Sequence, residues 1–205
     1  MKTIYLDHAA STPVDNKVLN AMLPFFTKTY ASPSSMHAMG QEAAGAVEKA
    51  RTGVARILHA QPEEIIFTSG GTESINLALK GIAFAKGKGH IITSQIEHPA
   101  VLETCRHLET KGFIVTYLPV DKYGLVSPTA VEKAIHKETI LITIMYANNE
   151  IGTIQPIADI GRIAQRRGIP FHSDACQAGS LELNVEKLNV DMLTLNGSKT
   201  YAPKG

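Results

Sequence analysis

The sequence has few cysteines, almost no net charge and no long apolar run, and each shortage excludes a class of protein. Its 2 cysteines make no disulfide framework and fit a reducing compartment. A formal net charge of +1 gives no electrostatic surface for nucleic acid or anionic membranes. The longest strongly apolar stretch, residues 140–147, is far too short to span a bilayer.

The amino-terminal sequence also differs from a secretory signal, because Asp7 stands where such a signal needs its apolar region. We therefore expect a cytoplasmic protein that binds neither nucleic acid nor membranes, and we expect no metal site. Hydrophobic residues make up 44% and charged residues 19% of the 205 residues, as is usual for a soluble globular protein.

Apolar runs and helical patterns alternate along the chain, which predicts strand–helix–strand units. We expect strands at residues 64–68, 90–93, 113–120, 139–146, 169–173 and 190–195. We expect helices at residues 14–26, 37–59, 73–85, 99–111, 127–136 and 156–167. Strands that alternate with helices predict an α/β fold with a mainly parallel, doubly wound sheet. Open sheets of this kind bind ligands at the carboxyl ends of their strands.

The loop at residues 69–72, SGGT, joins an expected strand to an expected helix. Glycines there leave backbone N–H groups free to surround an anion, the helix dipole favours negative charge, and Thr72 adds a hydroxyl donor. The loop is neither a Walker A loop nor a G-x-G-x-x-G loop, which disfavours nucleotide binding. By itself it is equally compatible with a phosphate site around Gly71 and with a plain strand-to-helix turn.

Two further loops carry polar side chains that have a functional and a structural interpretation. His98 follows the expected strand 90–93 and could stack on a planar cofactor, shuttle protons or cap the next helix. Asn148 and Asn149 follow the most apolar strand and could order a ligand or satisfy their own turn.

The last two strands end in an acid and an amine. Asp174 could cap a short helix, or it could be a buried carboxylate that pairs with a positive group such as a protonated pyridine nitrogen. Gln177 lies about one helical turn further on and would face the same side. Lys199 follows strand 190–195, as a solvated charge or as an amine held for carbonyl chemistry.

The combination is more specific than its parts. An anion site, a stacking histidine, an acid for a ring nitrogen, a hydrogen-bonding amide and a lysine are what pyridoxal 5′-phosphate requires. The acid keeps the ring nitrogen protonated, so that the ring withdraws electrons from the substrate carbon. The lysine binds the cofactor aldehyde and later acts as a base, which requires burial or neighbouring charge to lower its pKa.

With these residues in view, the sequence resembles cysteine desulfurases of the NifS/IscS type, in the class V aminotransferase group of fold-type I pyridoxal-phosphate enzymes. The resemblance runs over essentially the whole chain. It is carried by the motifs YLDHAASTP, YASPSSMH, FTSGGTES, EHPAV, NNEIGTIQPI, HSDACQ and NGSKTYAPKG.

The resemblance implies a role for each candidate residue. Lys199 would bind the cofactor covalently and act as the base, while His98 would stack on the ring and assist proton transfer. Asp174 would pair with the ring nitrogen, and Asn149 and Gln177 would reach the ring oxygen and the substrate side. The phosphate would be held by Gly71, Thr72, Asn196, Gly197 and Ser198.

The implied reaction converts L-cysteine to L-alanine. Sulfur would pass to an enzyme cysteine as a persulfide and then to an acceptor protein, either an iron–sulfur scaffold or a tRNA-thiolation enzyme. The family also implies a homodimer. The alternatives are a selenocysteine lyase or another class V enzyme, and an inactive fragment or the pyridoxal-phosphate-binding half of a split enzyme.

The chain departs from the family pattern at three positions and in length. Ser198 stands where many members have histidine, Ser32 where asparagine is common and Ala202 where glycine is common. Family members continue beyond the cofactor lysine and carry the sulfur-accepting cysteine and a carboxylate-binding arginine there. We therefore expect residues 1–12 to belong to the small domain and residues 13–205 to form a cofactor-binding large domain, incomplete at its carboxyl end.

Two consequences follow from that expected incompleteness. We expect the isolated chain to be inactive in turnover. In the family, a strand after the lysine joins the first strand to the rest of the sheet, so strand 64–68 would lose a neighbour here and expose its backbone groups.

Cys176 is the only cysteine near the expected site, and we interpret it as a packed thiol rather than the sulfur carrier.

Overall fold

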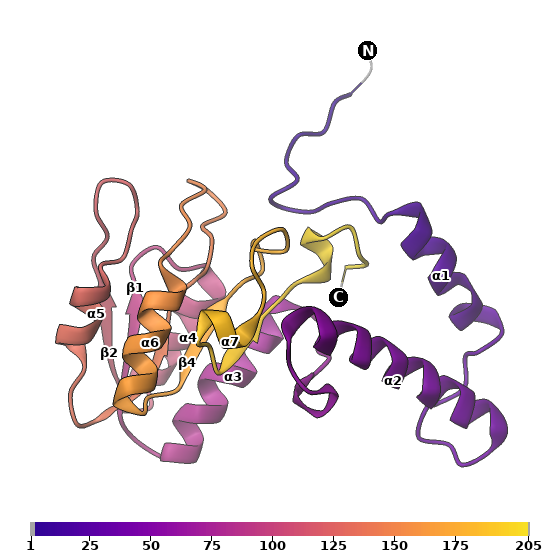
Figure 1. Ribbon diagram of the computed structural model, residues 1–205, viewed down its shortest axis with the longest axis horizontal. Coiled ribbons are helices and arrows are strands. Elements are labelled where there is room, and N and C mark those ends of the chain that lie inside the picture. The colour runs from indigo at the N-terminus through magenta and orange to yellow at the C-terminus, as the bar shows by residue number, and fades with distance from the viewer. Residues whose placement is uncertain (1–2, 205) are drawn as a thin grey trace.

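Five parallel strands form one sheet in the computed structural model, which describes residues 3–204 (Figure 1). The strands are β1 (His90–Ser94), β2 (Ile114–Leu118), β3 (Thr139–Thr143), β4 (Phe171–Asp174) and β5 (Met192–Thr194). Their order across the sheet is β2-β1-β3-β4-β5. Because this order changes direction between β1 and β3, the loops that follow these two strands diverge and leave a crevice at their carboxyl ends. The predicted α/β fold with a parallel sheet is confirmed.

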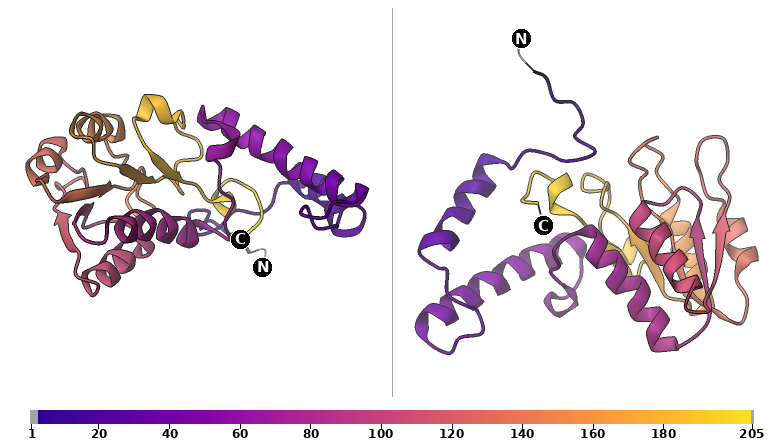
Figure 2. Two further views of the ribbon diagram at one scale, coloured as in Figure 1. Left: turned by 90° about the horizontal axis from the view of Figure 1, so that it is seen from below. Right: turned by 180° about the vertical axis from the view of Figure 1, so that it is seen from behind.

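Helices cover both faces of the sheet, as the continuous apolar strands require (Figure 2). One face carries α3 (Gly71–Lys86) and α4 (Pro99–Glu109), and the other carries α5 (Pro128–Ala134), α6 (Ile157–Arg167) and α7 (Val185–Leu188). Ile91 and Leu141 are buried in the core under α3 and α4. Their chain neighbours Ile92 and Ile142 are buried in the core under α5 and α6. Successive strand residues thus supply two separate cores.

Two long helices project to one side of the sheet (Figures 1 and 2). Helix α1 (Asn16–Thr27) has no buried residue and exposes Leu19, Leu23, Phe25 and Phe26. Helix α2 (Ala38–Leu58) packs on the sheet body near its carboxyl end, where Ala55 and Leu58 contact side chains from the β5 region. The rigid framework around the crevice is therefore the sheet with α3 to α7.

The predicted strand at residues 64–68 is wrong. Residues Pro62–Glu64 form a 3-10 turn (η1), and residues 65–68 after it are not in a strand. Ile65 is buried against α2, whereas Ile66 and Phe67 are 68% and 52% exposed. Within residues 3–204 this segment joins no ladder of the sheet. A strand needs a neighbour for its backbone N–H and C=O groups, so an apolar β-branched sequence alone does not make one.

The strand predicted at residues 139–146 is shorter in the structure, where β3 ends at Thr143. Residues of the segment that follows are nevertheless hydrogen-bonded to β4. Ile144 N donates to His172 O at 3.2 Å, and Tyr146 N donates to Asp174 O at 2.8 Å. The chain after β3 is therefore held at its β4 side up to the sheet edge.

Within residues 3–204, no helix has the length and apolar character needed to cross a membrane.

Candidate active site

A cavity of about 610 Å³ opens at the carboxyl ends of β1, β3, β4 and β5. All of the sequence-predicted site residues line it except Gly197 and Ser198. The predicted residues in its wall are Gly71, Thr72, His98, Asn149, Asp174, Gln177, Asn196 and Lys199. Cavities of this size hold small organic ligands and cofactors. The structure therefore brings together side chains that are spread over 129 positions of the sequence, from Gly71 to Lys199.

The amino terminus of α3 forms one end of the cavity. Gly70 has a φ of 151°, a conformation that favours glycine, and Gly71 begins the helix. A Cβ atom on Gly71 would lie 2.8 Å from Cys176 Sγ, so the backbone approaches the neighbouring loop more closely than a side chain would allow. The first amides of a helix have no internal acceptors and carry partial positive charge. This end of the cavity therefore suits an anion.

Hydrogen bonds hold the loop before α3 in place. The Glu73 carboxylate accepts from Ser69 N at 2.6 Å and from Ser69 Oγ at 2.5 Å. These bonds hold the pKa of Glu73 below its usual range. Thr68 Oγ1 and Ser74 Oγ are 2.7 Å apart and tie the other side of the turn to the helix.

Asn196 faces the same end of the cavity from the opposite side. Its Oδ1 accepts from Ser198 N at 3.1 Å and from Ser198 Oγ at 2.9 Å, which directs its amide nitrogen toward Gly71. Gly197 begins the 3-10 turn η2 (Gly197–Lys199) behind Asn196. Ser198 therefore does not line the cavity itself, but its hydrogen bonds hold the Asn196 side chain, which does.

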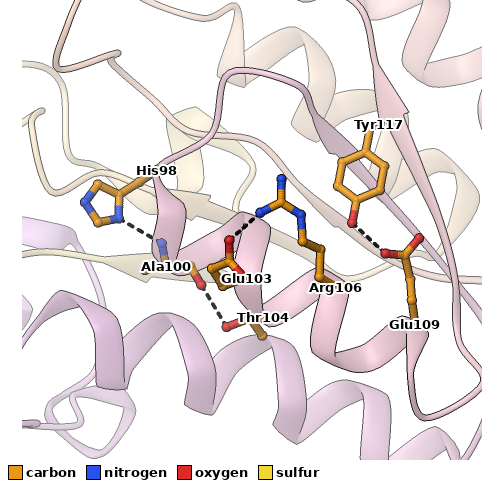
Figure 3. Close-up of polar contacts among 7 residues, drawn as sticks. All are labelled: His98, Ala100, Glu103, Thr104, Arg106, Glu109 and Tyr117. Carbon is orange, nitrogen blue, oxygen red and sulfur yellow. Dashed lines mark hydrogen bonds and ion pairs between the residues drawn. The ribbon is translucent and has the colours of Figure 1, made fainter.

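His98 lies at the start of α4, and its interpretation as a helix cap is confirmed. Its Nδ1 accepts the N–H of Ala100 at 3.0 Å and thereby caps the helix, as Figure 3 shows. Its ring also lines the cavity. Because Nδ1 is the acceptor, a neutral His98 ring carries its proton on Nε2, the nitrogen left free for other partners.

Asp174 ends β4 with a buried carboxylate. Its Oδ1 accepts from Cys176 N at 3.0 Å, and the side chain is 5% exposed. The residues that follow form turns rather than a helix, so the interpretation of Asp174 as a helix cap is wrong. Burial, with a further contribution from the negative charge of Asp174, raises the pKa of the Cys176 thiol, which stays neutral. Cys176 lines the cavity.

Lys199 reaches across the cavity to the amino-terminal segment. Its ammonium group donates to Ala9 O at 2.8 Å and also to Ala10 O. Gln177 Nε2 donates to the same Ala9 oxygen at 2.8 Å. Sequence analysis placed no residue of this segment in the site, because the contacts use backbone carbonyls that leave no side-chain pattern. Asp7 lines the cavity beside them.

The neighbouring asparagines differ in what they contact. Asn148 orders its turn: its Oδ1 accepts from the N–H groups of Glu150 at 2.9 Å and Ile151 at 3.1 Å. Asn149 lines the cavity.

Among residues 3–204 there is no group of three His, Cys, Asp or Glu side chains arranged to hold a metal ion.

Comparison with known proteins places the chain in a family. The aminotransferase class-V model matches residues 4–205. The chain belongs to this family. Class V aminotransferases and cysteine desulfurases are pyridoxal-phosphate-dependent enzymes.

The class V chain has curated relatives that are named cysteine desulfurases. Cysteine desulfurase IscS of Methanosarcina thermophila is 56% identical over 100% of this chain and 51% of its own length. The mitochondrial cysteine desulfurase of Candida albicans is 50% identical over 100% of this chain and 43% of its own length. The chain spans about half the length of the curated relatives it matches.

Solved structures agree with the family assignment. A structure described as SspA in complex with cysteine matches with a TM-score of 0.97 and 50% identity, over 99% of this chain and 59% of that one. A NifS-like protein matches with a TM-score of 0.96 and 45% identity, over 100% of this chain and 57% of that one. The resemblance to NifS/IscS-type enzymes is confirmed.

Proposed function

We propose that this chain carries the cofactor-binding part of a pyridoxal-phosphate-dependent cysteine desulfurase, which converts L-cysteine to L-alanine and passes the sulfur on as a persulfide. The observation that carries the proposal is the convergence of Lys199, Asp174, His98 and the α3 amino terminus on one cavity. The similarity to a structure with bound cysteine supports the choice of substrate.

The residues present fit the cofactor, as the close approach of Gly71 to Cys176 indicates. The α3 amino terminus, with Thr72 and the Asn196 amide, would hold the phosphate. Asp174, at the other side of the cavity, would hold a proton on the ring nitrogen. Once bound, the cofactor supplies an electron sink for the substrate α-carbon.

The remaining side chains would orient the ring and move protons. His98, fixed by its bond to Ala100 N, would lie beside the ring and offer its Nε2 proton to the substrate side. Gln177 and Asn149 would donate to the polar groups of the ring and the substrate. Lys199 would exchange its contacts with Ala9 and Ala10 for the cofactor aldehyde. After the substrate amine displaced it, its free Nζ amine would take the proton from the substrate Cα.

The finer features of the whole protein belong to the same proposal. We expect a cytoplasmic homodimer that gives its sulfur to an acceptor protein of iron–sulfur assembly or tRNA thiolation. The IscS names of the relatives support such an acceptor, and a mitochondrial relative shows that location varies within the family. The neutral Cys176 thiol is assigned a packing role and not the role of sulfur carrier.

Cofactor attachment tests the proposal directly. Pyridoxal phosphate added to the purified chain should give a visible absorbance band, and borohydride reduction followed by peptide mass mapping should locate the label on Lys199. Lys199→Ala should lose both signals. Lys204→Ala removes an exposed lysine nearby and should keep them. Label found on another residue, or equal binding by Lys199→Ala, would refute the assignment.

A further inference from the structure

One buried carboxyl lies directly behind the cavity and has no role in the proposed chemistry. Glu97 precedes His98 in the loop after β1 and is 5% exposed. Beyond the last paired residues, Ile92 and Ile142, β1 and β3 diverge. On its other side the segment after β3 remains bound to β4, through the N–H groups of Ile144 and Tyr146. Glu97 fills the resulting gap: its Oε1 accepts from Met145 N at 3.0 Å. The Glu97 carboxyl therefore accepts the hydrogen bond from Met145 N that a backbone carbonyl of β1 would accept if the two strands were still paired.

Two other hydrogen bonds reinforce this junction. Ser94 Oγ donates to the same Glu97 oxygen at 2.6 Å. Asn148 Nδ2 donates to Ile96 O at 3.0 Å, one residue before Glu97. The loop that carries His98 and the segment that carries Met145 are therefore joined side to side, and both His98 and Met145 line the cavity.

The surroundings of Glu97 favour its neutral form. Within residues 3–204, its Oε2 has no hydrogen-bond partner and no cationic side chain pairs with it. An ionised carboxylate with a bare oxygen in the core is strongly unfavourable. The titratable groups coupled to it are Asp174 on β4 and Cys105 on α4. Burial, aided by the negative charge of Asp174, raises the pKa of Glu97 to about 8.

We propose that Glu97, hydrogen-bonded between the ends of β1 and β3, is a positioning residue that fixes His98 and Met145 at the cavity and adds no charge next to Asp174, the residue that would hold the ring nitrogen. A second charged carboxylate nearby would disfavour the ionised form of a carboxyl group, whereas a neutral acid does not. Two neighbouring carboxyl groups can therefore serve different functions when only one of them is charged. This inference rests on the proposed function, since the ring nitrogen belongs to the cofactor.

Three variants test the role of Glu97 in cofactor binding. Glu97→Gln keeps a neutral acceptor for Met145 N, so its dissociation constant for pyridoxal phosphate should stay within about twofold of wild type. Glu97→Ala removes the acceptor and should weaken binding by about tenfold. Val131→Ala makes a space in the buried core under α5 at a residue that does not line the cavity, and it should lower stability while leaving cofactor affinity unchanged. Equal losses in Glu97→Gln and Glu97→Ala would overturn the proposal.

Two measurements without cofactor keep the inference separate from the proposed function. Infrared spectroscopy at neutral pH should show the C=O band of a protonated carboxyl that Glu97→Gln abolishes and that Glu103→Gln, on the exposed side of α4, retains. Amide hydrogen exchange at Met145 should be slow in wild type and Glu97→Gln, and fast in Glu97→Ala. If wild type fails to bind the cofactor, only the proposed function fails; if the band is absent or survives Glu97→Gln, the inference fails.

Discussion

Replacing Glu97 by glutamine should change how the stability of the chain depends on pH. Burial raises the pKa of Glu97 from 4.5 to about 8 in the folded chain. Below pH 4.5 the carboxyl is neutral in both states and contributes no difference. As pH rises above that value, the unfolded chain releases the proton while the folded chain keeps it, so the free energy of unfolding falls until the pH passes the folded pKa. Glu97→Gln lacks this titration.

The magnitude follows from the shift. Each pH unit between the two pKa values removes about 1.4 kcal/mol of stability, so wild type loses about 3 kcal/mol relative to Glu97→Gln between pH 4.5 and 7. The glutamine amide brings its own buried N–H groups, which cost about 1–3 kcal/mol at every pH if they lack acceptors. The test is therefore the slope of the difference with pH, and not the absolute stability at one pH.

Urea unfolding followed by circular dichroism at a series of pH values measures this slope. The chain has no tryptophan, so fluorescence would give a weak signal. Glu103→Gln, which removes an exposed carboxyl from α4, should give a curve parallel to wild type. Parallel curves for wild type and Glu97→Gln would show that Glu97 ionises in the folded chain as it does in the unfolded one, and the reasoning would be refuted.

Three other predictions concern the cavity and its supports. Gly71→Ala should reduce pyridoxal-phosphate affinity at least tenfold in an absorbance titration, because the new Cβ would meet Cys176 Sγ at 2.8 Å; adding Cys176→Ala should restore part of the loss. Thr12→Val removes a hydroxyl that donates to Ser198 O at 3.0 Å, and calorimetry should show a loss of about 1–2 kcal/mol. Burial lowers the pKa of His172 to about 4, so the neutral ring stabilises the fold above pH 6.5 and the contribution is lost on acidification toward pH 4; His172→Gln should flatten this part of the urea-midpoint profile.

The sequence predicted the sheet well, because β1 and β3 carry apolar residues on both faces and clear helix signals separate the strands. The carboxyl-end loops were predicted for the same reason: once the strands are parallel, His98, Asp174 and Lys199 must follow strand ends at one edge. The strand at residues 64–68 was wrong because strand formation depends on a neighbour, and local composition does not supply one. The loss of that neighbour, which the family resemblance led us to expect, is confirmed within residues 3–204.

The contributions of Glu97 and of the amino-terminal segment were missed for two physical reasons. Glu97 acts through burial, which its charged side chain would not suggest from sequence. Ala9 and Ala10 act through backbone carbonyls, so their side chains carry no signal. Asn148 and Asn149 are adjacent and identical in type, so the sequence could not show that Asn148 bonds within the turn and that Asn149 lines the cavity.

The contacts of Lys199 with the amino-terminal segment have a consequence for the order of folding. The bond from Lys199 to Ala9 joins residues 190 positions apart, and Thr12 N donates to Ser198 O at 2.9 Å. Closing so long a loop is entropically unfavourable until the sheet has brought the two segments together. We therefore expect the lysine to reach its place last, with pulse-labelled exchange protecting the β1 and β3 amides before that of Thr12. A chain still being synthesised would then have its sheet before it has a site for the cofactor.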